Sequence, residues 1–322
     1  MLTRRSLFTL GLATATAALA SGCSRSEPSA VSSGTGFSHS PSGYEGRTID
    51  LPARPERLVV DTYSFAAMAP YGIRPVGHWG YGEDDPTTIG TADPSVSTSV
   101  GRDAELSLEA VATLKPDALI GYGNTAGTGW TWWSEGVTER VAQIAPYIPI
   151  RLSGSGIVDV IEEYRRLAGA LGLDVDSAEV RHAKDDFDAA LSRIADLTAG
   201  RKLRVLALQA NPDNLYLGVN VAVLKLLAGA GVQLVPAEPT KPGGPWAEVS
   251  WENISRYKAD LIMDFKTSSA EAHAQAPWRE LGPVKAGQVT DWNDKRPNNH
   301  RAYADWLNGF ADAYERAEPL PD

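Results

Sequence analysis

Residues 107–122, SLEAVATLKPDALIGY, decide the fold, because residues 250–265 repeat their pattern as SWENISRYKADLIMDF. Each copy opens with a serine, which is a typical helix N-cap, and carries a glutamate two residues later. A lysine and an aspartate then precede an apolar run that is typical of a buried strand. A helix followed by a strand, found once in each half of the chain, predicts two similar α/β lobes with parallel sheets.

The segments on either side of these two copies extend the alternation of strands and helices. Residues 57–63 (RLVVDTY) and 202–209 (KLRVLALQ) are apolar runs that predict strands, and a further strand is expected to end near Trp79. Residues 79–102 have little periodicity and predict mostly loop, and residues 302–315 predict a C-terminal helix. The second copy, residues 250–265, is expected to begin with an ordinary helix, like the first.

The stretch from 156 to about 197 has helical spacing throughout, with a break near Gly172. Its second part, from about Ser177, repeats apolar residues on one face of a helix. At about 1.5 Å per residue this part would be about 30 Å long. We therefore expect a long helical segment that joins the two lobes.

The composition excludes several classes of function. The chain has 322 residues and a formal net charge of -10, whereas nucleic-acid binding needs a basic surface. Its single cysteine, Cys23, allows no intramolecular disulfide and no cysteine-based metal site. The five histidines are scattered, and no HExxH or GxSxG motif is present. The sequence therefore predicts neither an enzyme nor a metal site formed by the protein itself.

The N-terminal sequence is typical of a targeting signal and is not expected to be part of the fold. Arg4 and Arg5 precede an apolar run from Leu7 to Ala20, which predicts an export signal over residues 1–22 of twin-arginine type. The signal ends in ALASGC, which resembles a lipobox and would make Cys23 a lipidated N-terminus; the alternative is an ordinary free thiol. Residues 23–44 are rich in Ser, Gly and Pro and predict a flexible tether. We expect an extracytoplasmic protein with a lipid anchor in the cell membrane.

A glycine- and tryptophan-rich loop, GYGNTAGTGWTWW, occupies residues 121–133. Gly121, Gly123 and Ala126 have the spacing of a dinucleotide-binding fingerprint, but no acidic residue ends a following strand about twenty residues later. Ligands of open α/β sheets lie beyond the carboxyl ends of strands, and this loop follows such an end. Of Trp130, Trp132 and Trp133, we expect one or two to face a ligand and the rest to anchor the loop; Trp130 and Trp133 are the candidate ligand-binding residues.

Other aromatic and charged residues are expected at the same edge of each sheet, although several of the aromatic residues could instead be core. Trp251, Trp278 and Trp306 fall on predicted helices and are expected in the core. The acidic segment GEDDP contains Glu83 to Asp85 and reads as a solvated loop, or as a site that favours a ligand with a free amine. The candidate ligand-binding residues are Tyr63, Trp79, Tyr81, Tyr122, Tyr216, Trp246, Lys266, Trp292 and Arg296.

The chain resembles the substrate-binding proteins of ABC importers for iron-siderophores and vitamin B12. The resemblance rests on PERLVVDTYSFAAMAPYGIRPVG (55–77), VGRDAELSLEAVATLKPDALIG (100–121), the long helical segment, EVSWENISRYKADLI (248–262) and PWRELGPVKAGQV (277–289). It implies an α/β fold of two Rossmann-like lobes joined by a long rigid helix, with the ligand in the cleft between them. The expected parts are residues 45–155, 156–200 and 201–322.

The resemblance also implies a function, and within the family the chain is most similar to binders of ferric hydroxamate siderophores. The siderophore, and not the protein, would hold the iron, and no cofactor is implied; haem and cobalamin are the alternative ligands. Arg102 matches an arginine that faces the hydroxamate oxygens, against the alternative of a surface ion pair with Asp103 or Glu105. Glu109 and Glu252 match glutamates that dock on two permease subunits. A monomer is expected.

Overall fold

The computed structural model describes residues 36–321, so the predicted export signal and Cys23 lie outside the described residues. All of the described residues belong to one unit. Within this range, no helix combines the length and the apolar character that crossing a membrane requires.

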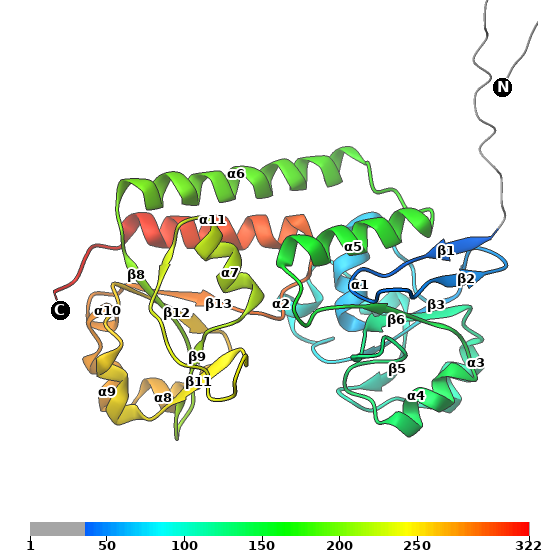
Figure 1. The fold of residues 1–322 in the computed structure, drawn as a ribbon, viewed down its shortest axis with the longest axis horizontal. Helices are drawn as coiled ribbons and strands as arrows, with labels where there is room; N and C mark the ends of the chain where they lie inside the picture. The colour runs from blue at the N-terminus through cyan, green and yellow to red at the C-terminus, as the bar shows by residue number, and fades with distance from the viewer. Residues whose placement is uncertain (1–35, 322) are drawn as a thin grey trace, which may run out of the picture. The chain divides into compact units, whose positions relative to one another are not determined.

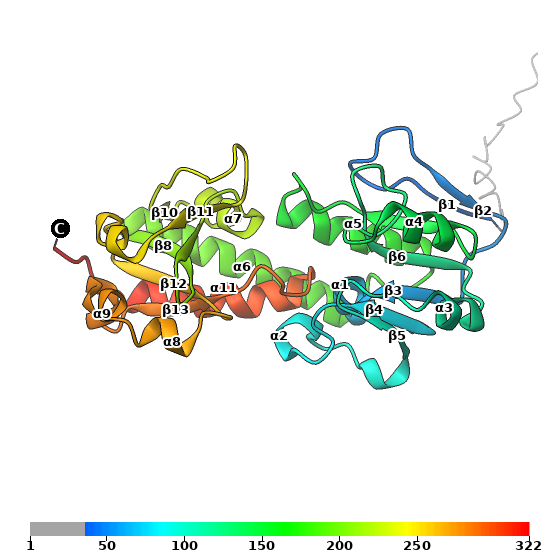
Figure 2. The ribbon, with the colours of Figure 1, turned by 90° about the horizontal axis from the view of Figure 1, so that it is seen from below.

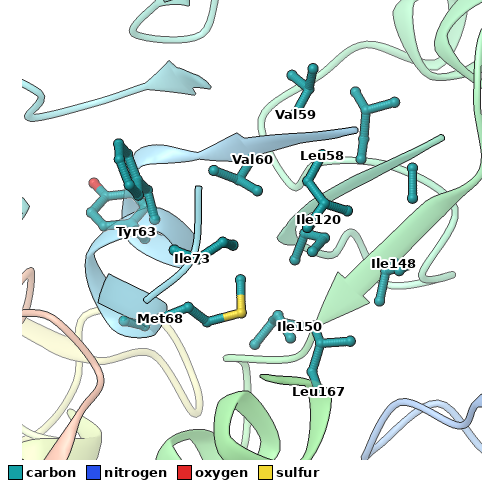
Figure 3. Close-up of a cluster of buried hydrophobic side chains, with 14 of the residues drawn as sticks. Leu58, Val59, Val60, Tyr63, Met68, Ile73, Ile120, Ile148, Ile150 and Leu167 are labelled. Atoms are coloured by element: carbon teal, nitrogen blue, oxygen red, sulfur yellow. The ribbon is translucent and has the colours of Figure 1, made fainter. Parts of the chain in front are cut away.

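The first lobe is built on a five-stranded parallel sheet in the order β5-β4-β3-β6-β7. The central strand β3 is fully buried, as its apolar sequence predicts, and its register on β6 pairs Val59 with Leu119. Figure 3 shows the side chains of these strands packed together in the core of the lobe. The strands are β3 (Leu58–Asp61), β4 (Gly77–Gly80), β5 (Thr98–Arg102), β6 (Ala118–Tyr122) and β7 (Tyr147–Ile150).

Short helices connect these strands (Figure 1). Ser107 caps α3 as the sequence predicts and accepts a hydrogen bond from Ala110 N, and Asp61 caps α1 by accepting one from Ser64 N. Residues 79–102 are less irregular than expected, because they contain α2 and the edge strand β5. The helical segments are α1 (Thr62–Met68), η1 (Ala69–Tyr71), α2 (Pro86–Ile89), η2 (Pro94–Val96), α3 (Leu108–Leu114), α4 (Glu135–Ala142) and α5 (Ile157–Ala170).

The second lobe contains a mixed sheet in the order β11-β9-β8-β12-β13, with β10 beside β8. The expectation of a parallel sheet holds for β10, β8, β12 and β13 and is wrong for the other two strands. Residues 211–214 turn the chain back, so β9 runs antiparallel to β8. The strands are β8 (Arg204–Ala210), β9 (Leu215–Gly218), β10 (Gln233–Leu234), β11 (Trp246–Val249), β12 (Leu261–Phe265) and β13 (Val289–Trp292).

The helices of the second lobe differ from the prediction at one place. The second copy of the repeated pattern forms a 3₁₀ helix, η3, and not an α-helix, and its N-cap residue Ser250 makes no side-chain capping bond. Trp251, Trp278 and Trp306 are buried, as expected. The helical segments are α7 (Ala222–Gly229), η3 (Trp251–Arg256), α8 (Ala270–His273), α9 (Ala276–Glu280), α10 (Gly282–Lys285) and α11 (His300–Arg316).

Helix α6 (Ala178–Gly200) runs between the lobes, whereas α5 packs mainly on the first lobe and places Ile157 and Ile161 in the core of the second. The α6 side chain Val180 belongs to the core of the first lobe, and Phe187 and Ile194 belong to the core of the second. Figures 1 and 2 both show α6 and α11 side by side, and these two helices share more contacts than any other pair of elements. The connection is therefore a pair of packed helices, which is stiffer than one helix alone.

The aspartate of the repeated pattern has the same structural role in both lobes. Asp117 precedes β6, and its Oδ2 accepts hydrogen bonds from the backbone N–H groups of Glu56 (2.9 Å) and Arg57 (2.8 Å), just before β3. Asp260 precedes β12, and its Oδ2 accepts from Arg204 N (2.7 Å) at the start of β8. In each lobe the aspartate thus satisfies backbone donors at the entry of the neighbouring central strand and helps to fix its register.

An additional β-hairpin falls in the range that we expected to be a tether. The strands β1 (Phe37–His39) and β2 (Ile49–Leu51) pair antiparallel, and Phe37 and His39 are buried. His39 Nε2 lies 2.9 Å from Glu163 Oε1 on α5, and Glu163 also accepts hydrogen bonds from Ser42 and Arg166. The tether boundary at residue 44 is therefore wrong, because buried contacts begin at Phe37.

Glu163 is expected to make the stability of the fold depend on pH. Burial alone would raise its pKa, but the hydrogen bonds from His39, Ser42 and Arg166 lower the pKa from 4.5 to about 2. This stabilisation is present above pH 4.5 and is lost as the pH falls from about 4.5 towards 2. Glu163→Gln should therefore lower the free energy of unfolding by about 2–3 kcal/mol at pH 7.

Urea unfolding at pH 7 and at pH 3 measures this effect. The wild-type protein should lose more stability between the two pH values than Glu163→Gln does. The control is Glu162→Gln, which removes the same charge from the neighbouring and more exposed position of α5. Equal loss of stability in wild type and Glu163→Gln would contradict the assignment.

Candidate functional site

A buried carboxylate organises the carboxyl edge of the first sheet. Asp61 ends β3 and is 0% exposed. Its Oδ1 accepts from Ser64 N (2.7 Å), and its Oδ2 accepts from Tyr122 N (2.8 Å) and Trp130 Nε1 (2.8 Å). Burial raises the pKa of Asp61, and the three donated hydrogen bonds oppose this shift. One side chain thus ties together α1, the end of β6 and the tryptophan loop.

The glycines of the loop allow this close approach. A Cβ atom at Gly121 would lie 2.9 Å from Asp61 Oδ2 and 2.6 Å from the Tyr147 hydroxyl oxygen, so no larger residue fits. Gly127 has a φ of +69°, in the left-handed region that glycine tolerates best. The loop therefore bends around a side chain of the protein, which gives its glycines a reason that needs no phosphate ligand.

Above Asp61 the aromatic rings form a shelf, composed of Tyr63, Tyr81, Tyr122, Trp130 and Trp132. Tyr63 and Tyr122 stack with centroids 4.7 Å apart, and Trp132 meets Trp130 edge-on at 4.7 Å. Trp132 also contacts the other three rings at 5.5–6.2 Å. Trp132 is 40% exposed and is the outermost ring of the shelf, so it offers a flat apolar face to a ligand.

The structure corrects the choice among the predicted aromatic residues. Trp130 is fully buried and anchored on Asp61, and Trp133 is buried against Trp79 at 5.3 Å. Trp79 and Trp292 are also fully buried, and Trp292 Nε1 donates to Leu208 O (3.0 Å). These four tryptophans are core in this conformation. Of the loop tryptophans, the one that faces outward is Trp132, because the other two fill the space beneath it.

A cavity of about 740 Å³ opens beside the shelf and is lined by both lobes. This volume lies within the usual range of small-molecule sites, about 300–1,000 Å³. In the lining, Lys225 and Asp294 are the charged residues. The aromatic lining comprises Tyr122, Trp132 and Tyr303, and Asn298 also lines the cavity.

A second cavity of about 640 Å³ adjoins it on the second lobe. Pro245 and Asp294 line both cavities, so the two cavities adjoin at these residues. Tyr216 and Trp246 line the second cavity.

Arg102 lies at the end of β5 and forms ion pairs with two acidic residues of the GEDDP segment. Its guanidinium contacts Glu83, and its Nη1 donates to Asp84 Oδ2 at 2.6 Å. Glu83 is buried and also bonds His78 Nε2 (3.0 Å) and Ser99 Oγ (3.1 Å). The segment is thus an ordered part of the lobe, and the Arg102 partners differ from the expected Asp103 or Glu105. Its contact with a ligand remains a prediction.

The other two predicted cations have structural partners. Lys266 Nζ lies 3.2 Å from Asp85 Oδ1 and 2.8 Å from Thr87 Oγ1, so it bridges from the second lobe to the first. Arg296 lies over the Trp306 ring at 4.5 Å and donates to Asn293 O (3.0 Å). Neither residue lines the two cavities described above.

The sequence analysis did not identify several residues of the site. Asp61 is an acidic residue at the carboxyl end of a buried strand, and this position could have indicated that it belongs to the site. Asp294 and Asn298 lie in the polar segment NDKRPNN that follows the last strand, and the same rule points to it. The sequence could not show that Trp132 is the exposed ring, because nothing in it distinguishes the three neighbouring tryptophans before they pack in the fold.

A model of the periplasmic binding protein family matches residues 74–294. This span covers more than half of the chain, including four of the five strands of the first sheet, the connecting helix and the whole second sheet. The chain belongs to the periplasmic binding protein family. Proteins of this family bind ligands, and this periplasmic binding protein has the two lobes and the shared cavity that such binding requires.

Individual relatives agree with this membership. The Fe(3+)-citrate-binding protein YfmC of Bacillus subtilis is 26% identical over 289 residues, which cover 85% of this chain and 84% of the relative. The crystal structure of DesE, a ferric-siderophore receptor protein from Streptomyces coelicolor, is 29% identical, with a TM-score of 0.80 over 88% of this chain and 100% of DesE. The Fe3+-Desferal bound protein FhuD from Vibrio cholerae shares the fold at 20% identity, with a TM-score of 0.59 over 82% of this chain and 99% of FhuD.

The acidic residues of the described part form no metal site, and two of them are the predicted docking glutamates. Across residues 36–321, no group of three or more His, Cys, Asp or Glu side chains is arranged to hold a metal ion. Glu109 and Glu252 are both exposed, in the first turns of α3 and η3. The hydrogen bond of the Ser250 hydroxyl lowers the pKa of Glu252.

Asp61→Asn should destabilise the fold, because an asparagine cannot accept at both side-chain positions. At least one of the donors Ser64 N, Tyr122 N and Trp130 Nε1 would then face an NH₂ group. A buried donor without a partner costs about 1–3 kcal/mol, so the free energy of unfolding should fall by at least that amount. Urea unfolding measures it, with Asp84→Asn as an exposed control; a change below about 0.5 kcal/mol would contradict the role of Asp61.

Proposed function

We propose that this protein captures a ferric siderophore outside the cytoplasm and delivers it to an ABC permease for iron uptake. The single observation that carries the proposal is the cavity of about 740 Å³ between two lobes, which has an exposed tryptophan on one wall. The siderophore holds the iron, and the protein recognises the outside of the complex. The protein performs no chemistry on its ligand.

Family membership and the relatives support this choice of ligand. DesE is a ferric-siderophore receptor and is 29% identical to this chain over 88% of its length. YfmC binds Fe(3+)-citrate, which is also a ferric chelate. A lipoprotein relative, YhfQ of Bacillus subtilis, is described as a putative ABC transporter substrate-binding protein and supports a lipid anchor at Cys23 and an extracytoplasmic location.

The chemistry of the cavity favours the hydroxamate class. The larger cavity has one lysine and one aspartate among its lining residues, so it offers no excess of positive charge. A tris-catecholate complex carries several negative charges, and burying them without cations is costly. A ferric hydroxamate complex is neutral or cationic and has apolar linkers that suit the face of Trp132. Arg102 remains a candidate for contact with the hydroxamate oxygens if it exchanges its present acidic partners.

Contacts between the lobes suggest that binding requires only small movements. Lys266 bridges to Asp85, and Asn298 Nδ2 donates to the Tyr122 hydroxyl at 2.9 Å. Together with the packed pair α6 and α11, these bonds restrain a wide hinge motion. We therefore infer a cleft that is largely formed before the ligand enters.

Titration with ferrioxamine and with ferric enterobactin tests the ligand class. The quenching of tryptophan fluorescence should show tighter binding of ferrioxamine. Trp132→Ala should weaken it about tenfold, which corresponds to about 1.4 kcal/mol, because an exposed ring that covers the ligand is lost.

The control for Trp132→Ala is Trp278→Phe, which removes a buried indole outside both cavities and should leave the affinity unchanged. A preference for the catecholate would overturn the hydroxamate assignment. Tight binding of haemin or cobalamin, with no binding of ferric complexes, would overturn the proposed function.

The proposed docking on the permease predicts that a variant can keep its affinity for the siderophore and still lose uptake. Glu109→Ala combined with Glu252→Ala should leave siderophore affinity within about twofold, because neither residue lines a cavity. Each substitution removes the favourable interaction of an exposed acid with the first turn of its helix, which the fold should tolerate. Uptake of ferric siderophore by cells that express the cognate importer should be abolished.

The matched control replaces Glu139 and Glu271 by alanine, since these are exposed glutamates on one helix of each lobe. This double variant should retain uptake. Normal uptake by the Glu109 and Glu252 variant, or loss of ligand binding in the purified protein, would each show the docking assignment to be wrong.

A further inference from the structure

Asp294 places a buried carboxylate oxygen in the cleft, with no hydrogen-bond donor from the part of the chain that the structure describes. It lines both cavities at the point where they join. Its Oδ1 is buried, and among the described residues no donor makes a hydrogen bond to it. The nearest cation is Lys295, whose Nζ lies 3.6 Å from this oxygen on a side chain that is about half exposed. A buried carboxylate oxygen that lacks a donor is costly unless a partner arrives.

The backbone that carries Asp294 is held rigidly by its asparagine neighbours. Asn293 donates to Thr87 Oγ1 (3.2 Å) on the first lobe and accepts from Lys295 N (2.7 Å). Asn298 donates to the Tyr122 hydroxyl, and Asn299 donates to Ala66 O (3.1 Å) while it caps α11. The backbone on either side of Asp294 is thus held in place before a ligand binds, which lowers the entropic cost of binding.

The surrounding charges leave Asp294 available to a ligand. Arg296, the other nearby cation of the same segment, is engaged with Trp306 and Asn293 O. Lys225 lines the larger cavity on an exposed position of α7. In the second cavity Lys241 and Lys295 lie with Glu248. Burial is the main cause that raises the pKa of Tyr63, and the charge of Asp294 adds to it, in agreement with a carboxylate close to the aromatic shelf.

We propose that Asp294 binds a protonated amine of the ligand, so that the cleft selects ferric siderophores that carry a free ammonium group. This inference rests on the proposed function and narrows its ligand class. The ferric centre would lie on the aromatic side of the cleft beside Trp132, and the ammonium group would reach the junction of the cavities. The ammonium supplies the hydrogen-bond donor that Oδ1 lacks and neutralises a partly buried charge, which makes the pair a strong, charge-assisted hydrogen bond.

Two ferric complexes that differ in one group provide the test. Ferrioxamine B has a free ammonium, and its N-acetylated form has the same iron coordination without that charge. The wild-type protein should bind ferrioxamine B at least about tenfold more tightly than the acetylated complex. In Asp294→Asn this preference should fall to about twofold or less, while the affinity for the acetylated complex stays within about twofold of wild type.

Two further variants separate a specific contact from a general effect of charge. Asp291→Asn removes the same charge from the same segment at an exposed position that lines neither cavity, and it should keep the preference. Lys295→Ala removes the competing cation and should increase the preference. This variant also tests the proposal if Asp294→Asn does not fold.

The outcomes distinguish this inference from the proposed function. Equal affinity of the wild-type protein for the two complexes overturns the role of Asp294 and leaves siderophore capture intact. An equal loss of affinity for both complexes in Asp294→Asn, or an unchanged preference in that variant, also overturns it. Failure of the wild-type protein to bind either complex overturns the proposed function and this inference together.

Discussion

The Asp61 carboxylate is the interaction on which the binding face of the first lobe depends. A carboxyl group without exposure to water requires hydrogen-bond partners from the protein, and its donors come from three different segments: the start of α1, the end of β6 and the indole of Trp130. Because Trp130 is fixed, its neighbour Trp132 is left outside as the top of the aromatic shelf. The position of a surface ring is thus set by a buried acid beneath it.

The same principle links the two lobes. Polar side chains at the carboxyl ends of strands in one lobe find their partners in the other, as in the pairs Lys266–Asp85 and Asn298–Tyr122. These bonds, with the packed helices α6 and α11, hold together the two lobes that line the cavity, and among the described residues few buried side-chain atoms of the lining are left without partners. Asp294 is the notable group that they leave, and this explains why a ligand with a donor would gain affinity there.

The two copies of the internal repeat share the hydrogen bonds of one aspartate, although their secondary structures differ. Asp117 and Asp260 both accept backbone N–H groups at the entry of a neighbouring central strand. The helix before them is an α-helix in the first lobe and a 3₁₀ helix in the second. Sheet order also diverges, because β9 and β11 run antiparallel in the second lobe. Two lobes can therefore share their strand register while presenting different walls to one ligand.

The sequence by itself determined the α/β class, the two lobes, the long connecting helix and the edge at which the site lies, because apolar periodicity and strand ends are local properties. It could not decide which of Trp130, Trp132 and Trp133 is exposed, since that depends on the distant Asp61. Nor could it show that Arg102 pairs with Glu83, or that Phe37 and His39 belong to the core. Only the tertiary structure decided these points, because burial and the pairing of charges are set by segments that meet in space after folding.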